Sequence, residues 1–251
     1  NHKINFVQSL RSSEDYIYKH VLNVAILSAI IAGQMGFSVG RINLLVKSAI
    51  LHDIGALKLQ QLPDAEDLDD GTKEVVKKNT QETLDRYGDL DEEVLRLITQ
   101  MQELYTRESD AEIPAGLKES VNANILYVAD AYDRMTAMKS FEEPTSEVKA
   151  VRELLADEER YNKKIVNALI HGISILYPGV CVELSNGEKG LVITENEDNI
   201  FEPTVLDFRN NNLYDLSDPS VKQTIEIADV MKTMDNRIKL DKSLLEEYQA
   251  N

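Results

Sequence analysis

The segment Leu51-His52-Asp53-Ile54-Gly55 places an imidazole and a carboxylate side by side at the end of an apolar run with helical spacing. A second histidine, His20, precedes this segment, and an aspartate in an apolar neighbourhood, Asp130, follows it. Two imidazoles and two carboxylates are enough to hold one divalent cation, and the resulting site would be electrically neutral. The sequence therefore predicts a metal site that joins three separate helices.

The region around this segment, residues 1–172, is predicted to form an all-helical domain. Its apolar residues recur at helical spacing, and its three prolines fall at polar breaks between the periodic runs. We expect helices over residues 16–35, 38–54, 72–87, 91–105, 119–139, 146–155 and 158–171. Gly55 is expected to end the second of these helices.

The spacing of apolar residues changes after Gly172, and residues 173–230 are predicted to form a small β subdomain. The runs 180–184 and 190–194 flank Ser185-Asn186-Gly187, which predicts a hairpin with an Asn-Gly turn. A second hairpin is expected over 204–208 and 213–216, and a strand at 224–230 would close a small sheet or barrel. Residues 231–251 are polar and compatible with a C-terminal helix, so the fold class expected is mainly α.

Charge and cysteine content restrict the partners and the compartment. The 251 residues contain 27 lysines and arginines against 44 aspartates and glutamates, a formal net charge of −17. Such a chain is expected to repel a nucleic-acid polymer, and a small phosphorylated ligand would need a metal ion or a local cation. Cys181 is the only cysteine, which excludes an internal disulfide and favours a reducing, cytoplasmic compartment.

The ends of the chain and its hydropathy lead to two further expectations. There is no basic segment leading into an apolar stretch and no apolar run of about 18 residues, so neither secretion nor membrane insertion is expected. Because the chain starts at Asn1 rather than at a methionine, we expect it to be a piece of a longer signalling protein.

Each candidate ligand taken alone has a simpler interpretation. His20 lies on the same helical stripe as Val24 and Leu27, and a single histidine on such a face is more often a hydrogen-bonded core residue. Asp130 would be costly to bury without a partner, and Arg134, four residues later, could serve as that partner in place of a cation. The occurrence of His, His-Asp and Asp in order on three helices is what favours a metal.

That order resembles the HD superfamily of metal-dependent phosphohydrolases, whose pattern falls here on His20, His52, Asp53 and Asp130. The flanking residues 19–25, 49–55 and 128–133 are similar to the HD-GYP branch, which acts on cyclic di-GMP, and residues 177–190 are similar to the tail that often follows those domains. The resemblance covers nearly the whole chain. It implies an HD-domain helical bundle with a divalent ion (Fe, Mn, Zn, Ni or Mg) and a phosphorylated small molecule or nucleotide as substrate.

The chain departs from the HD-GYP pattern at the positions that the resemblance assigns to further ligands. The expected Gly-Lys is Gly55-Ala56, with Lys58 two positions late. Asn79 stands where the resemblance expects the next histidine. Two histidines and a glutamate are replaced by Met101-Gln102-Glu103, and the Gly-Tyr-Pro loop is replaced by Glu112-Ile113-Pro114. Amide oxygens and a thioether compete poorly with water for a hard cation, so we predict one ion at most. Cleavage of cyclic di-GMP by the branch's route needs two ions about 3.5 to 4 Å apart, and full activity of that kind is not expected.

Two functions from different classes are compatible with these residues. The first is a metal-dependent phosphohydrolase, a phosphomonoesterase or phosphodiesterase, in which Asp53 orients or deprotonates the nucleophile and Lys58 reaches a phosphate. The second is a catalytically inactive relative that binds a ligand or a protein, either a different partner or a second copy of the chain. Glu103, Asp133, Arg134, Asn79 and Gln102 are expected to support the site, either as auxiliary groups or by holding the ligand side chains in place. A third interpretation has no metal, and the four residues form a polar cluster with Arg134 or Lys58.

Overall fold

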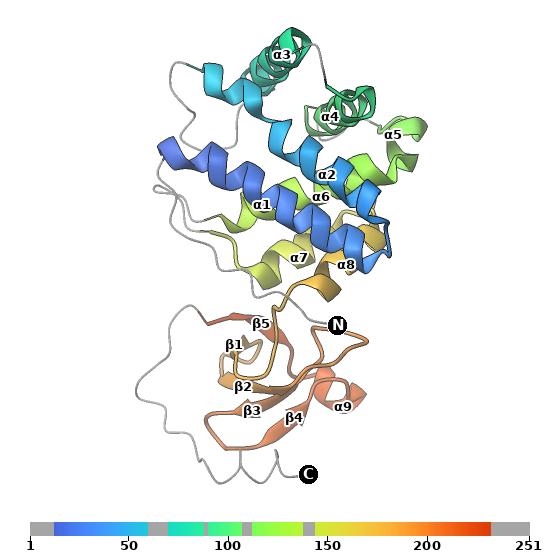
Figure 1. Ribbon diagram of the computed structural model, residues 1–251. Coiled ribbons are helices and arrows are strands. Elements are labelled where there is room, and N and C mark those ends of the chain that lie inside the picture. The colour runs from blue at the N-terminus through green and yellow to red at the C-terminus, as the bar shows by residue number, and fades with distance from the viewer. Residues whose placement is uncertain (1–12, 60–69, 88–89, 107–111, 138–143, 232–251) are drawn as a thin grey trace. The chain divides into compact units, whose positions relative to one another are not determined.

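The computed structural model describes residues 13–59, 70–87, 90–106, 112–137 and 144–231 (Figure 1). The chain divides into two compact units, of which the first comprises Asn1–Thr145 and Ala150–Ile173, and the second Ser146–Lys149 and Ser174–Asn251. The predicted C-terminal helix falls, apart from Met231, outside the described residues, and the division at 172 and 230 stays a prediction.

The first unit is built from helices, and the prediction of a mainly α chain is confirmed. In chain order the elements are α1 Ser13–Gln34, α2 Val39–Leu51, the 3-10 helix η1 Ile54–Lys58, α3 Asp70–Tyr87, α4 Glu92–Tyr105, α5 Ala115–Glu119, α6 Val121–Thr136, α7 Glu147–Ala156 and α8 Lys163–Gly172. Three of these helices start at a side-chain cap: Ser38, Asp91 and Asn162 accept a hydrogen bond from a backbone N–H of the first turn of α2, α4 and α8.

Each predicted helix differs from the observed one by at least one residue at an end, and three of these differences show how the chain is divided locally. The second ends at Leu51 instead of 54, because the chain turns at His52 and Asp53 and continues as η1. The helix expected over 119–139 corresponds to α6, which starts at Val121, and the short helix α5 before Ser120 was not predicted. The last begins at Lys163 instead of 158, because the Asn162 side chain caps it.

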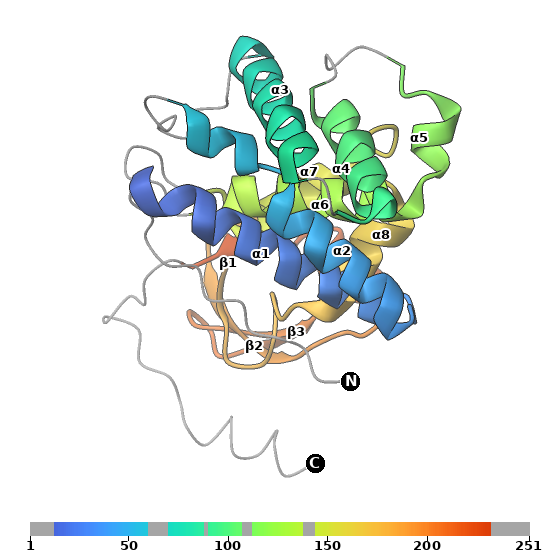
Figure 2. The same ribbon diagram turned by 45° about the horizontal axis from the view of Figure 1, so that its top comes forward.

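Helix α6 lies at the centre of the first unit. Both views show α1 beside α2, and α6 packs against α1, α4 and α8 (Figures 1 and 2). Apolar residues surround α6, and every residue from Ala123 to Asp133 is buried. A helix that is buried on all sides can hold a polar side chain only where that side chain has a partner. Asp130 and Asp133 are therefore bound to other groups in the interior.

Helix α1 bears on the prediction that the chain does not insert into a membrane. Residues Tyr16–Gln34 form the one described stretch that is long and apolar enough to cross a membrane. Half of this stretch is buried inside the protein, and it carries the fully buried His20. Burial of that kind is typical of the core helix of a helical domain.

The second unit contains an antiparallel five-stranded sheet of order β4-β3-β2-β1-β5. Its strands are β1 Cys181–Leu184, β2 Lys189–Thr194, β3 Thr204–Asp207, β4 Leu213–Asp215 and β5 Ile227–Val230, and the short helix α9 Pro219–Lys222 precedes β5. The two predicted hairpins are present, and Gly187, with a φ of 82°, makes the first turn as the Asn-Gly signal indicates. Strand β5 pairs with β1, so β4 and β5 are the two edges of the sheet.

Candidate metal centre

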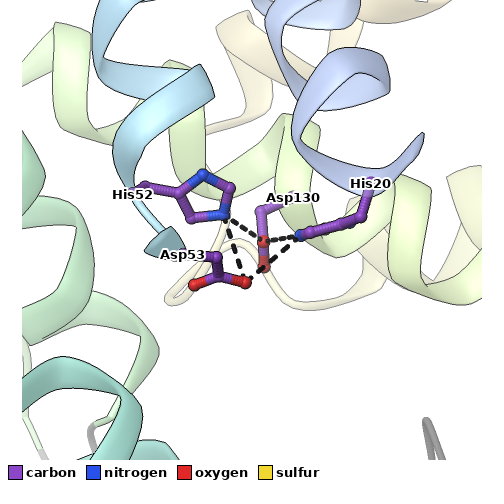
Figure 3. Close-up of side chains that lie close together, drawn as sticks. All are labelled: His20, His52, Asp53 and Asp130. Carbon is purple, nitrogen blue, oxygen red and sulfur yellow. Dashed lines mark hydrogen bonds and ion pairs between the residues drawn. The ribbon is translucent and has the colours of Figure 1, made fainter. Parts of the chain in front are cut away.

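Four buried side chains converge in the first unit, and we call them the HHDD cluster: His20, His52, Asp53 and Asp130. His20 lies on α1, Asp130 on α6, and His52 and Asp53 lie at the turn directly after α2 (Figure 3). His52 keeps helical backbone angles as the C-cap of α2, while Asp53, with φ −110° and ψ 17°, directs the chain into η1. The turn therefore presents two neighbouring side chains to the same point.

The donor atoms of the cluster are spaced as ligands of one ion would be. One ligand atom from each residue can be chosen so that all four lie within 4.8 Å of one another. Asp130 Oδ1 is 2.9 Å from His20 Nε2 and 3.3 Å from His52 Nε2, and Asp53 Oδ2 is 3.7 and 3.6 Å from the same nitrogens. Ligands bound at about 2.0 to 2.2 Å around one ion lie roughly 3.0 to 3.6 Å from their neighbours. The donor set and its spacing fit a transition metal.

Hydrogen bonds orient both imidazole rings toward the centre of the cluster. The Nδ1–H of His52 donates to the carbonyl oxygen of Ala49 at 2.6 Å, and that of His20 donates to Asp133 Oδ2 at 2.7 Å. Asn23 in turn donates to Asp133 Oδ1 at 2.8 Å. With Nδ1 protonated in a neutral ring, the Nε2 lone pair of each histidine is available to a cation.

Arg134 joins the two carboxylates of the cluster. Its Nε donates to Asp130 Oδ2 at 2.9 Å, its Nη2 donates to Asp53 Oδ2 at 2.8 Å, and its guanidinium lies 4.6 Å from the centre of the Tyr105 ring. With neutral histidines, the carboxylates of Asp53, Asp130 and Asp133 and this guanidinium sum to −3 + 1 = −2. A divalent cation would balance that charge, which is the observation that favours a metal over a purely polar cluster.

The charges within the cluster shift the pKa values of its members. Burial would raise the pKa of Asp130, but Arg134 and the two histidines hold it well below its usual value. Burial would likewise raise the pKa of Asp53, but His52 and Arg134 lower it. Burial would lower the pKa of His52, yet Asp53 and Asp130 raise it above 6.5. Both carboxylates are therefore ionised at neutral pH, and a proton on His52 competes with a cation.

Of the auxiliary candidates, Asp133 and Arg134 bind members of the cluster, whereas Gln102 and Asn79 donate to backbone carbonyl oxygens. Gln102 is buried and donates its amide to the carbonyl oxygen of His52 at 2.9 Å. Asn79 donates to the carbonyl oxygen of Gly55 at 3.4 Å, and Lys58 donates to the carbonyl oxygen of Asn79 at 3.4 Å. Glu103 is exposed on α4 and Met101 is buried. Within the described part of the chain, the residues grouped as possible metal ligands are the four of the cluster.

Sequence reasoning missed several contacts that shape the site. Arg134 was predicted as the partner of Asp130, but its second bond reaches Asp53, which is 81 residues away. Tyr16 stacks on the His20 ring, with 5.6 Å between the ring centres and 4° between the planes. The spacing of four residues from Tyr16 to His20 on a helix was the available signal for that contact.

Comparison with known proteins adds a family and two relatives. Residues 17–135 match the model of the HD domain family, which confirms the predicted HD domain. The chain is 24% identical over 234 residues to the cyclic di-GMP phosphodiesterase PdeB of Borreliella burgdorferi, covering 88% of this chain and 60% of that protein. It is 22% identical over 201 residues to the cyclic di-GMP phosphodiesterase PA4108 of Pseudomonas aeruginosa, covering 78% of this chain and 49% of that protein. The chain thus matches about half to three fifths of the length of these relatives.

Proposed function

We propose that this chain, which carries an HD domain over residues 17–135, is a metal-dependent phosphohydrolase that holds one divalent ion, Fe, Mn, Zn, Ni or Mg, in the HHDD cluster. Its proposed substrate is a phosphorylated small molecule or nucleotide, and its proposed setting is cytoplasmic signalling. One observation carries the proposal: four buried donors of the right chemistry lie within 4.8 Å of one another.

Asp53 is the residue proposed to act on the nucleophile. Its Oδ2 faces the histidines and Arg134, while its other carboxylate oxygen points away from the three other side chains of the cluster (Figure 3). The lowered pKa of Asp53 keeps this oxygen ionised, so that it can accept a proton from an attacking water. A divalent ion in the cluster would lower the pKa of such a water and polarise a phosphoryl oxygen.

Hydrolysis then exchanges one bond to phosphorus for another. The oxygen of the water forms a bond to phosphorus while the bond from phosphorus to the ester oxygen breaks. Asp53 takes one proton from the water and later releases it to solvent, and the departing oxygen takes up a proton from solvent and leaves as an alcohol. The products are an alcohol and a phosphate carrying one more free oxygen than the substrate had.

A second ion is not part of the proposal. The amides of Asn79 and Gln102 are hydrogen-bonded to the carbonyl oxygens of Gly55 and His52, so these groups serve the backbone of the turn after α2. Amide groups carry no charge, so a second ion at these two positions would be held weakly. We therefore do not expect full cyclic di-GMP phosphodiesterase activity, although both relatives carry that name.

The alternative is an inactive relative that binds a ligand or a protein partner. It is supported by Lys58, which is exposed and bonded to the Asn79 carbonyl, and by Arg134, which pairs with both carboxylates of the cluster. In that case the ion, if present, would only tie three helices together.

Metal analysis and hydrolysis assays on the same preparations separate these functions. We would compare wild type with His52→Ala and with His171→Ala, which removes an exposed histidine of α8 outside the cluster. The proposal predicts about one equivalent of a transition metal in wild type and in His171→Ala, and much less in His52→Ala. Hydrolysis of p-nitrophenyl phosphate should follow the metal, and cyclic di-GMP should be a poor substrate.

Three other results of these assays would each favour a different interpretation of the site. Wild type with one equivalent of metal but no more activity than His52→Ala on any substrate would leave a structural ion in an inactive relative. Wild type without metal would refute the metal centre. Rapid cleavage of cyclic di-GMP with two equivalents of metal would refute the one-ion assignment.

A further inference from the structure

The guanidinium of Arg134 has one edge engaged by the cluster and another edge without a partner among the described residues. Nε and one N–H of Nη2, which form the side edge of the group, donate to Asp130 and Asp53. The end edge, made of Nη1 and the second N–H of Nη2, has no protein acceptor in the described part of the chain. Nη1 is also absent from the fully buried unpaired atoms there, and the side chain is 16% exposed, so the described residues do not completely enclose this edge.

The position of Arg134 is fixed from two sides. The carboxylates of Asp130 and Asp53 hold its side edge, and the Tyr105 ring lies 4.6 Å from its central carbon. A guanidinium held in this way loses little further freedom when it binds an anion. The free end edge therefore presents two parallel N–H donors in a preset direction, beside the point where the four donors of the HHDD cluster converge.

We propose that Arg134 binds the phosphoryl group of the substrate through this end edge and makes the site selective for phosphomonoesters over phosphodiesters. This inference rests on the proposed function, because it places the phosphoryl group between the cluster and Arg134. It names the substrate class of the site and a residue that determines specificity.

The chemistry of the two ester classes explains the selectivity. A monoester has three terminal oxygens, of which one can face the cluster and two can accept from the two N–H groups of the end edge. A diester has two such oxygens, so one N–H of the fork would lose its partner on binding. A monoester also carries between one and two negative charges at neutral pH, whereas a diester carries one.

Other nearby cations do not offer the same contact. Lys58 is exposed and donates to the carbonyl oxygen of Asn79, and Ala56 stands where the resemblance expects a phosphate-binding lysine. Arg134 ion-pairs with both carboxylates of the cluster and thus keeps its charge beside the reacting group.

The test compares Arg134→Gln and Arg134→Lys with wild type and with the control Arg41→Gln. Arg41 also lies over an aromatic ring, 3.6 Å from the centre of Phe37, and also donates to a side-chain oxygen, that of Asn122, but it is not part of the cluster. For each protein we would measure metal content, the binding of inorganic phosphate by calorimetry, and kcat/KM on p-nitrophenyl phosphate and on bis-p-nitrophenyl phosphate.

We expect Arg134→Gln to retain about one equivalent of metal and to bind inorganic phosphate roughly 10- to 100-fold more weakly, because two charge-assisted hydrogen bonds are lost. Its monoester to diester ratio of kcat/KM should fall by about tenfold. Arg134→Lys keeps the charge but lacks the fork, so it should recover part of the phosphate affinity and little of the selectivity. Arg41→Gln should match wild type in every measurement.

Three results would overturn the role of Arg134. The first is phosphate affinity within about twofold of wild type in a metallated Arg134→Gln protein, and the second is an unchanged monoester to diester ratio. The third is loss of the metal in both variants, which would mean that Arg134 holds the ligand carboxylates instead of the substrate. Wild type without metal would refute the proposed function itself, and that result is distinct from these three.

Discussion

Substitution of Gly55 by alanine tests how closely the turn after α2 packs against α3. A Cβ atom at position 55 would lie 2.3 Å from the backbone nitrogen of Thr80, 2.3 Å from the carbonyl oxygen of Val76 and 2.5 Å from Thr80 Oγ1. Ordinary contact begins near 3.4 Å, so the two backbones would have to separate by about 1 Å. Two of the three atoms are backbone atoms, and a side-chain rotation cannot relieve those contacts.

The expected cost combines this overlap with a lost hydrogen bond. Overpacking of a buried site typically costs about 1 to 3 kcal/mol. The bond from the Gly55 N–H to Thr80 Oγ1, 3.0 Å long, would be broken by the same movement, at roughly 1 kcal/mol. We therefore expect Gly55→Ala to lower the free energy of unfolding by about 2 to 4 kcal/mol. Asp53 precedes Gly55 by two residues, so metal affinity should fall as well.

Urea unfolding followed by circular dichroism, together with metal analysis, measures both effects. The matched control is Gly40→Ala on α2, where a Cβ would meet nothing within 4 Å and where alanine should stabilise the helix by up to about 1 kcal/mol. A Gly55→Ala protein that unfolds within about 1 kcal/mol of wild type and retains its full metal content would refute this reasoning.

Three further predictions concern the protonation and support of the cluster. In metal-free protein, Asp53 and Asp130 have lowered pKa values, so their ionised forms stabilise the fold fully above pH 3.8. His52 has a raised pKa, so its contribution to stability is complete only below pH 6.5. The free energy of unfolding should therefore be highest between these two pH values. The midpoint of urea unfolding, measured across this pH range with a chelator present to remove metal, checks this dependence. A stability maximum above about pH 8 would contradict it. Asp133→Asn should weaken metal binding by about 10- to 100-fold in competition with a chelator, because the Nδ1–H of His20 loses the charged acceptor that fixes its tautomer. Gln102→Leu removes the amide that donates to the buried carbonyl oxygen of His52 at 2.9 Å, and it should lower the free energy of unfolding by about 1 to 3 kcal/mol. An unchanged urea midpoint would show that the Thr80 hydroxyl alone satisfies that oxygen.

Local signals in the sequence account for most of the helical unit. The stripe of His20, Val24 and Leu27 predicts one buried face, and all three side chains are fully buried. The Asn-Gly turn predicts the first hairpin because the turn needs a left-handed conformation, which glycine adopts without strain. These features depend on neighbours within a few residues, and periodicity reports on such neighbours directly.

The features of the site that could not be predicted from the sequence depend on contacts between residues far apart in the chain. Gly55 was interpreted as a helix stop, whereas the structure requires glycine there because Thr80, on α3, leaves no room for a side chain. The bond from Arg134 to Asp53 joins residues on different elements, so no spacing rule could predict it. The resemblance to the HD superfamily predicts the four residues of the cluster, and the structure places their side chains close together. The binding of an ion to them stays a prediction.

The members of the cluster are far apart along the chain, with His20 110 residues from Asp130 and His52 78 residues from it. A single ion at this point would act as a reversible cross-link that closes two long loops, and the free energy of its binding would add to the stability of the folded unit. Since the four side chains come from three segments of the helical unit and are at most 4% exposed, they would release the ion together only when the helices separate. The lifetime of the bound ion would then report how often the helical unit opens.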